Sequence, residues 1–293
     1  MATDLRAAGR TGLAAGLRPY RMQIGLALYC FVCLWVDAHL ANVWEQDALG
    51  LFTLAVLFLL VRRLAAHDGR LVWMCVLVAS GVEVFASLIW GVYRYRWGNV
   101  PWFVPPGHGM VYVFGITAAR TPLMRRHAAL IIRTVFVLAT AWAVAGLTVL
   151  PHITGRLDVL GALFLPIFAL FLLRSPRAPM FAAIFVATSG LELIGVNMHT
   201  WMWQVTAPIS HIPSGNPPSV IAGGYCVIDG SAVIVGQALW GLARRIEPLW
   251  IRVRSQVLAP LAGPETLPSR RRRGCGRFAG RGGRPNGRHR GAG

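Results

Sequence analysis

The sequence predicts an all-α integral membrane protein of about eight transmembrane helices, arranged as two parallel four-helix repeats. Hydrophobic residues make up 55% of the 293-residue chain and charged residues only 14%, a balance that is rare in a soluble domain. Apolar runs of membrane-spanning length recur along the chain. Related sequence features also return after roughly 110 residues, and such a constant offset indicates internal duplication.

The predicted spans follow from these apolar runs. They cover residues 22–43, 48–61, 71–92, 102–119, 128–150, 157–173, 178–197 and 217–242. The domain organisation that results is a basic N-terminal segment at 1–21, a first repeat at 22–126, a second repeat at 127–243 and an Arg/Gly-rich tail at 244–293.

The arginines orient the predicted spans. The N-terminal segment is basic, and every second span is followed by arginines. These are Arg62, Arg63, Arg70, Arg120, Arg125, Arg126, Arg174, Arg177, Arg244 and Arg245. The alternate loops carry only Arg94, Arg96 and Arg156. The positive-inside rule therefore predicts a multi-pass protein of the cell membrane with both termini in the cytoplasm.

The net charge of +18 is concentrated partly in the C-terminal tail, where arginines alternate with glycines. This low-complexity composition predicts disorder. Because the tail lies on the predicted cytoplasmic side, we expect anionic membrane lipid to be its partner and expect no nucleic acid.

The repeat is clearest in two segments. SGVEVFASLIWGVYRY (80–95) and SGLELIGVNMHTWMW (189–203) each place one glutamate, Glu83 or Glu192, in an apolar run, and each ends in an aromatic-x-aromatic pair. An ionised group at the centre of a bilayer costs about 2.5–3.5 kcal/mol. A carboxyl there reduces this cost by keeping its proton, which makes it a proton donor.

The outer half of the predicted bundle gathers further polar residues. The predicted catalytic residues are Glu83, Glu192, Asp229, His199 and Tyr225. Glu192 and Asp229 are expected to form the acid/base pair, with Glu83 as a third carboxyl. The residues predicted to bind substrate lie in or beside two loops rich in aromatic residues and proline. They are Trp90, Tyr93, Tyr95, His108, Trp201, Trp203 and His211.

Four interpretations of these polar residues stay open. The carboxyls can join helices by hydrogen bonds without any chemistry. Carboxylates and histidines can bind a metal, although the chain has no HExxH motif and no paired histidine spacing, so no metal is expected. Duplicated halves with intramembrane acids are also found in proton-coupled transporters. The favoured interpretation is an intramembrane enzyme that transfers protons to and from an apolar substrate.

Two segments carry a resemblance to known families. ELIGVNMHTWMW (192–203) followed by GNPPSVIAGGYCVIDG (215–230) resembles the actinobacterial membrane spirocyclases of the avermectin type, which close a spiroketal on a polyketide and whose founding type can also dehydrate. Glu83, Gly91, Tyr93 and Tyr95 followed by VPWFVPP are similar to membrane carotenoid hydratases. Both resemblances imply acid/base chemistry without a cofactor on a lipophilic small molecule.

The chain has no nucleotide-binding glycine loop, no GxSxG motif and no serine triad, so redox, kinase and hydrolase classes gain no support. The expected function is a spiroketal cyclase or a hydratase/dehydratase acting on a lipophilic polyketide or isoprenoid. A proton-coupled transporter of a small or lipophilic molecule is the alternative.

Overall fold

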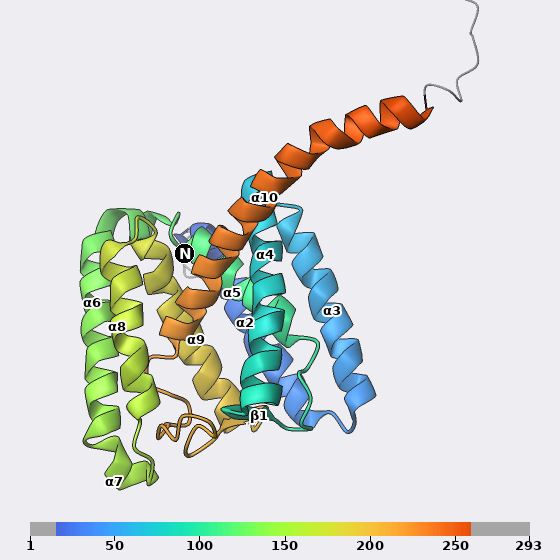
Figure 1. Ribbon diagram of the computed structural model, residues 1–293. Coiled ribbons are helices and arrows are strands. Elements are labelled where there is room, and N and C mark those ends of the chain that lie inside the picture. Colours follow the sequence, from blue (N-terminus) through green and yellow to red (C-terminus); the bar gives the residue numbers. More distant parts are fainter. Residues whose placement is uncertain (1–15, 259–293) are drawn as a thin grey trace, which may run out of the picture. The chain divides into compact units, whose positions relative to one another are not determined.

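The computed structural model describes residues 16–258, which are mostly helical (Figure 1). The elements in chain order are the 3-10 helix η1 (Arg18–Tyr20), α2 (Arg21–His39), α3 (Val43–Val61), α4 (Ala66–Glu83), the π-helix η2 (Val84–Trp90), β1 (Tyr93–Tyr95), α5 (Val104–Ala118), α6 (Pro122–Leu147), α7 (Leu150–Thr154), α8 (Val159–Arg174), α9 (Ala178–Asn197), β2 (Trp201–Trp203) and α10 (Ala222–Leu258). Most of the N-terminal segment and most of the predicted disordered tail lie outside the described residues.

The chain divides into two compact units, residues 1–242 and 243–293. The described part of the second unit is the end of helix α10. The first unit contains the other helices, both strands and the part of α10 up to Leu242, and it holds all of the predicted site residues.

Six helices in the described part of the chain are long and apolar enough to cross a membrane, which indicates a multi-pass membrane protein. They are Arg18–His39, Val43–Val61, Ala66–Trp90, Pro122–Leu147, Ala178–Asn197 and Ala222–Leu242. The predicted spans at 102–119 and 157–173 coincide with α5 and α8, which have only 15 and 16 residues. Length and composition therefore support six of the eight predicted spans.

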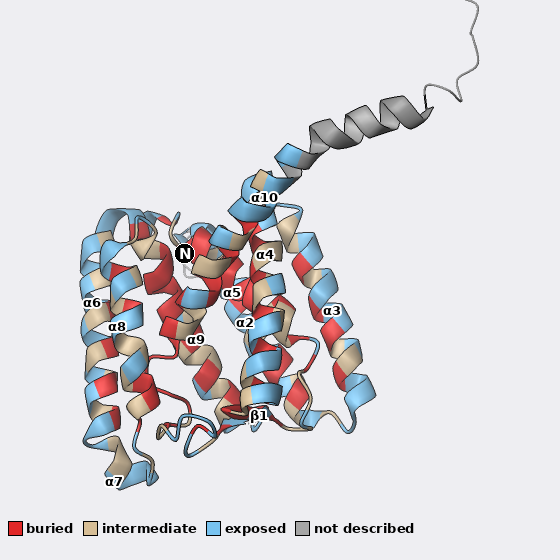
Figure 2. Ribbon diagram, viewed as in Figure 1, coloured by how far each residue is buried: buried red, intermediate tan, exposed pale blue. Residues whose placement is uncertain are grey.

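Helix α5 lies at the centre of the bundle and packs against α2, α3, α4 and α9. Most of its residues are buried, so it belongs to the core (Figure 2). Two of its glycines allow this close packing. A Cβ on Gly109 would lie 2.8 Å from side-chain atoms of Leu57 and Val76, and one on Gly115 would lie 2.8 Å from Ile184. Small residues commonly permit such close approach of helices in membranes.

The two strands form a small antiparallel sheet that joins segments more than a hundred residues apart in the chain. Tyr93 pairs with Trp203 and Tyr95 pairs with Trp201. Alternate residues of a strand point to opposite faces, so the four aromatic side chains lie together on the inner face. All four are buried, whereas Arg94 on the opposite face is exposed.

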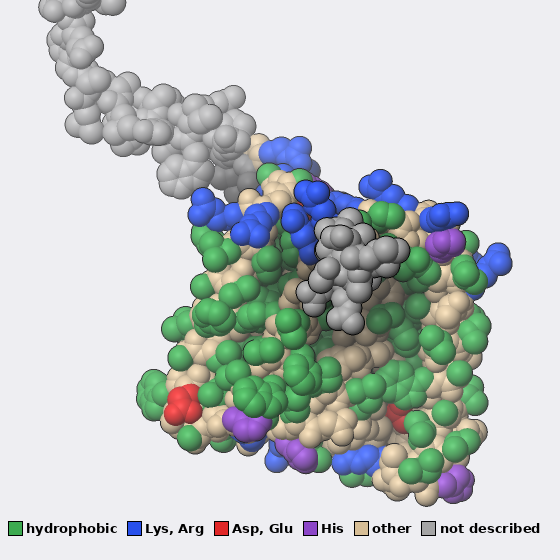
Figure 3. Space-filling model, turned by 180° about the vertical axis from the view of Figure 1, so that it is seen from behind, with side chains coloured by type: hydrophobic (Ala, Val, Ile, Leu, Met, Phe, Trp, Pro, Cys, Tyr) green, Lys and Arg blue, Asp and Glu red, His purple; other side chains and the backbone are tan. Residues whose placement is uncertain are grey.

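Arginine side chains gather at one end of the visible face, and hydrophobic side chains cover most of the surface below them (Figure 3). The alternate connections, which precede α3, α5, α8 and α10, lie at the opposite end together with the sheet (Figure 1). The sheet therefore lies at the end of the bundle remote from most of the arginines.

Candidate functional site

Glu83 is the last residue of α4 and is buried, with 5% of its surface exposed. The hydroxyls of Tyr93 and Tyr95 donate hydrogen bonds of 2.6 and 2.7 Å to its Oε2. His108 Nε2, on α5, lies 2.8 Å from its Oε1. Three polar partners therefore satisfy a carboxyl that would otherwise be costly to bury.

Glu192 on α9 is equally buried, with 4% of its surface exposed. The indole N–H groups of Trp201 and Trp203 donate hydrogen bonds of 2.9 and 3.1 Å to its Oε2. The Tyr225 hydroxyl lies 3.3 Å from its Oε1. Each glutamate thus accepts two hydrogen bonds on Oε2 from the aromatic-x-aromatic pair that follows it in the sequence, and each has a third partner near Oε1.

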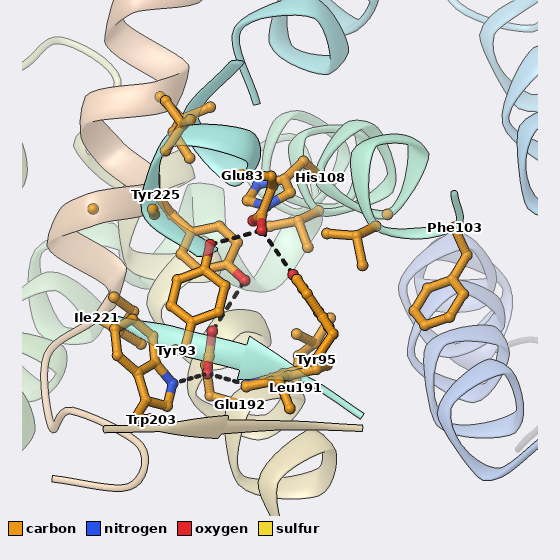
Figure 4. A pocket seen from close by; sticks show the side chains of 18 of the residues that line it. Glu83, Tyr93, Tyr95, Phe103, His108, Leu191, Glu192, Trp203, Ile221 and Tyr225 are labelled. Carbon is orange, nitrogen blue, oxygen red and sulfur yellow. Dashed lines mark hydrogen bonds and ion pairs between the residues drawn. The ribbon is translucent and has the colours of Figure 1, made fainter. Parts of the chain in front are cut away.

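The two aromatic pairs also contact one another across the sheet. The rings of Tyr93 and Trp203 have centroids 4.6 Å apart, and those of Tyr95 and Trp201 lie 6.1 Å apart in an edge-on arrangement. Figure 4 shows Glu83 and Glu192 on opposite sides of the Tyr93 and Tyr225 rings. The pairing of β1 with β2 therefore links the surroundings of the two glutamates into one site.

Tyr225 connects the remaining partners. Its ring stacks on the imidazole of His108, with centroids 4.7 Å apart and planes 22° apart, while its hydroxyl faces Glu192. One aromatic side chain thus contacts the histidine that is hydrogen-bonded to Glu83 and also reaches the other carboxyl.

Both glutamates line a cavity of about 340 Å³. Among the predicted site residues, those that also line it are Trp90, Tyr93, Tyr95, His108, Trp201, Trp203 and Tyr225. The rest of the wall is mainly apolar and includes Leu34, Phe103, Leu191 and Ile221. Such a cavity, apolar with a few convergent polar groups, is typical of small-molecule sites.

Burial raises the pKa of the Tyr93 and Tyr95 hydroxyls well above the ordinary value, and the neighbouring Glu83 carboxyl raises both further. Both strand residues therefore remain neutral hydrogen-bond donors over the physiological pH range.

Asp229 does not line the cavity, so the structure does not place it beside Glu192 as the expected acid/base pair. It is buried on α10, where Oδ1 accepts a hydrogen bond of 3.4 Å from Cys75 Sγ on α4 and Oδ2 has no hydrogen-bond partner among the described residues. On the same side of the bundle, Arg177 donates to the Tyr112 hydroxyl at 3.2 Å. The structure therefore pairs Glu192 with Glu83 across the cavity instead.

The two loop histidines, His199 and His211, do not line the cavity. His199 lies in the turn between α9 and β2 with φ at 57°. It lines a second hollow with Arg94, Arg96 and Arg156, and this hollow shares Tyr95 and Trp203 with the cavity wall. His211 is exposed in the loop before α10.

Sequence reasoning missed the wall that α2 and α3 contribute. Tyr29 donates a 2.8 Å hydrogen bond to Thr53, and both residues line the cavity with Cys33. Hydroxyl groups within two apolar runs were the available signal, but nothing in the sequence indicates that these runs are neighbours of the glutamates.

No group of three or more His, Cys, Asp or Glu side chains among residues 16–258 is arranged to hold a metal ion. Comparisons of the chain with protein-family models, with curated proteins and with solved structures find no match.

Proposed function

We propose that the first unit is an eight-helix bundle made of two parallel repeats, with α5 and α8 as its short members. The order of elements supports this: α2, α3, α4–η2, β1 and α5 are followed by α6, α8, α9, β2 and α10. The two glutamates have matching partners on the matching strands. The aromatic pair comes ten residues after Glu83 but nine after Glu192, and η2 accounts for the difference because a π-helical turn accommodates one extra residue.

The arginine distribution supports an orientation for the bundle in the cell membrane. The arginine-rich end faces the cytoplasm together with both termini, and the sheet faces the opposite side. Fusion of a reporter that is active only in the cytoplasm to each connection tests this orientation. Activity after α2 or α9 would contradict it.

The function that the site supports best is acid/base catalysis on a lipophilic molecule within the membrane. The observation that carries this proposal is the pair of buried glutamates facing one apolar cavity, each held by two strand side chains and a third polar group. A purely structural carboxyl needs partners but no cavity. Two carboxyls in different surroundings can act as acid and base in the same reaction.

The partners of the two carboxyls suggest their roles. Indole N–H groups can only donate, so Trp201 and Trp203 require Glu192 Oε2 to be an acceptor. A proton on Glu192 therefore belongs on Oε1, where Tyr225 can accept as well as donate. Glu83 accepts from the Tyr93 and Tyr95 hydroxyls, and a His108 tautomer protonated at Nε2 also donates to it, so Glu83 is the better base. We assign Glu192 as the acid and Glu83, with His108, as the base.

Two reactions use this arrangement without an oxidant or reductant. In spiroketal closure, the acid protonates a hemiketal hydroxyl, water leaves, a second hydroxyl adds to the oxocarbenium ion and the base takes the hydroxyl proton. In hydration, the acid protonates an alkene carbon, water adds to the cation and the base takes a proton from the added water. The aromatic walls stabilise the cation in both reactions by cation–π attraction.

These reactions are the ones implied by the resemblance of residues 192–230 to membrane spirocyclases and of Glu83 and its tyrosines to carotenoid hydratases. We accordingly propose a cyclase or hydratase/dehydratase acting on a polyketide or isoprenoid, without a redox cofactor.

The test is mass spectrometry of lipid-soluble metabolites from the source strain with the gene deleted and then restored. Accumulation of one uncyclised or unhydrated precursor is expected on deletion. The wild-type gene and a Glu45→Gln control, which changes an exposed glutamate outside the cavity, should both remove the precursor. The Glu192→Gln gene should leave the precursor accumulated. Unchanged metabolites on deletion, or full restoration by Glu192→Gln, would refute the proposal.

A second candidate function is a proton-coupled transporter. The observation that favours it is the buried Asp229, which lies outside the cavity and has one carboxyl oxygen without a partner among the described residues. Tyr112 and Arg177 are further polar residues between Asp229 and the arginine-rich end. Vesicles containing the protein and a pH-sensitive dye distinguish the two functions. Proton uptake that depends on added metabolite extract and is lost in Asp229→Asn would favour the transporter.

A further inference from the structure

The cavity is closed toward both ends of the bundle. At the sheet end it is covered by the four aromatic residues of β1 and β2, each no more than 7% exposed. Toward the arginine-rich end the last lining residues of the core helix α5 and of α10 are Val111 and Ile228, which are 4% and 5% exposed. These buried side chains leave no opening at either end of the bundle for a molecule as large as a polyketide or isoprenoid.

The exposed residues of the cavity wall lie on one side. Among the lining residues, Val82 on α4, Phe85 on η2 and Val227 on α10 are 37%, 50% and 44% exposed. All the other lining residues are buried or half-buried. The three exposed side chains are apolar and come from two segments, so the cavity reaches the surface between α4–η2 and α10.

The two helices diverge toward this opening. Nearer the arginine-rich end, a Cβ on Gly236 would lie 3.2 Å from Met74 Cγ, and the Arg70 guanidinium lies 4.9 Å from the centroid of the Trp240 ring. Further toward the opening, Cys75 Sγ on α4 still lies 3.4 Å from Asp229 Oδ1 on α10. Beyond this contact, Val82 and Val227 are exposed, so helix packing ends where the opening begins.

We propose that this opening is a lateral entrance through which an apolar molecule dissolved in the bilayer reaches the glutamates. Surface that consists of exposed apolar side chains on membrane-spanning helices faces lipid, not water. The chemistry of the occupant rests on the proposed function, whereas the path rests on the geometry alone.

The entrance lies close to the reacting groups. Val82 precedes Glu83 in the sequence, and Val227 follows Tyr225 by two residues. The cavity volume of about 340 Å³ is near the lower limit of the roughly 300–1,000 Å³ found for ligand pockets. A large polyketide or isoprenoid cannot fit inside it completely. The substrate therefore inserts its reactive end, and the remainder stays in the bilayer between α4–η2 and α10.

The experiment uses a small apolar photolabel, 3-(trifluoromethyl)-3-(m-iodophenyl)diazirine, dissolved in vesicles that contain the full chain. Adducts on each helix are counted by mass spectrometry after illumination. Helix α5 is the reporter, because it is a core helix whose residues Gly107, Met110 and Val111 line the cavity. Helix α6, with its exposed Val137, is the reference for ordinary contact with lipid.

We expect label on the cavity side of α5 in the wild-type protein. Val82→Trp and Val227→Trp narrow the opening from opposite sides, so each should lower the amount of label on α5 several-fold. Phe85→Ala widens the opening and should raise the amount of label on α5. Label on α6 should not change. Ile234→Trp is the matched control, because Ile234 is 69% exposed on α10 but does not line the cavity.

Absence of label on the cavity side of α5, or label there that none of the three entrance variants changes, would overturn the entrance. Because one variant is expected to increase the signal, misfolding of a tryptophan variant cannot imitate the whole pattern. Labelling does not depend on turnover. Glu192→Gln with normal α5 labelling and unchanged metabolites would refute the proposed function and leave the entrance standing.

Discussion

Replacing Glu192 by glutamine and by alanine should separate its structural role from its chemical role. Glutamine can direct its oxygen to the indole N–H groups of Trp201 and Trp203 and its NH₂ group to the Tyr225 oxygen, which can accept. All three contacts of the wild-type protein are kept. Alanine keeps none of them. The two variants should therefore be equally inactive but differ clearly in stability.

The size of the difference follows from the indoles. Neither N–H group can reverse its role, and Trp201 and Trp203 are 6% and 5% exposed, so water cannot readily replace the carboxylate. Leaving a buried donor unsatisfied costs about 1–3 kcal/mol, so two of them cost about 2–6 kcal/mol. We expect Glu192→Ala to lose stability in this range and Glu192→Gln to remain within about 1 kcal/mol of the wild type.

The assay is reversible unfolding in mixed micelles for the wild type and both variants, beside metabolite analysis of strains that carry them. The Glu45→Gln variant is the control for the metabolite analysis only, because both Glu45 oxygens accept hydrogen bonds at the start of α3 and an amide keeps one acceptor. If alanine and glutamine destabilise equally, the indoles do not depend on Glu192. If glutamine leaves turnover intact, the carboxyl proton is not used in the reaction.

Two further predictions concern the aromatic pairs. A Cβ on Gly195 would overlap the Trp201 ring, so Gly195→Ala should displace this side chain and lower the free energy of unfolding by about 1–3 kcal/mol. Gly190→Ala is the control, because Gly190 lies on the same helix with open space around it and the added methyl group should not destabilise the protein. Equal losses of stability in the two variants would contradict the packing of Trp201 on Gly195. The raised pKa values of Tyr93 and Tyr95 predict stability that is constant below pH about 10, the unfolded value, and falls above it by up to about 1.4 kcal/mol per pH unit for each tyrosine. Replacing both by phenylalanine should flatten this fall in a pH series of unfolding curves, and an unchanged slope would show that these tyrosines do not contribute to it.

The sequence predicted the helices well because hydropathy is a local property. The predicted span at 178–197 coincides with α9, and the other predicted spans overlap the helices described above. Helix α5 shows the limit of this reasoning. Its composition resembles a membrane span, but its 15 residues are mostly buried by other helices. Burial by protein and burial by lipid select similar residues, so hydropathy alone cannot distinguish them.

The site was predictable only in part, for a related reason. The spacing of Glu83 and Glu192 from their aromatic pairs is a property of one chain segment, and these residues line the same cavity. The place of Asp229 depends on the angle at which α10 crosses α4, and the sequence does not contain this information. The sequence placed Asp229 and the glutamates together in the outer half of the predicted bundle, but depth does not determine which side of a helix faces the cavity.

The two proposed repeats differ most in the chemistry of their aromatic pairs. Tyrosine hydroxyls both donate and accept, so Tyr93 and Tyr95 can adjust when Glu83 gains or loses a proton. The indoles of Trp201 and Trp203 can only donate, so they restrict the proton of Glu192 to one oxygen. A duplicated unit that only joined helices would have no need of this difference. The acid and base roles that we propose for Glu192 and Glu83 need this difference, because equivalent surroundings would give both glutamates the same role.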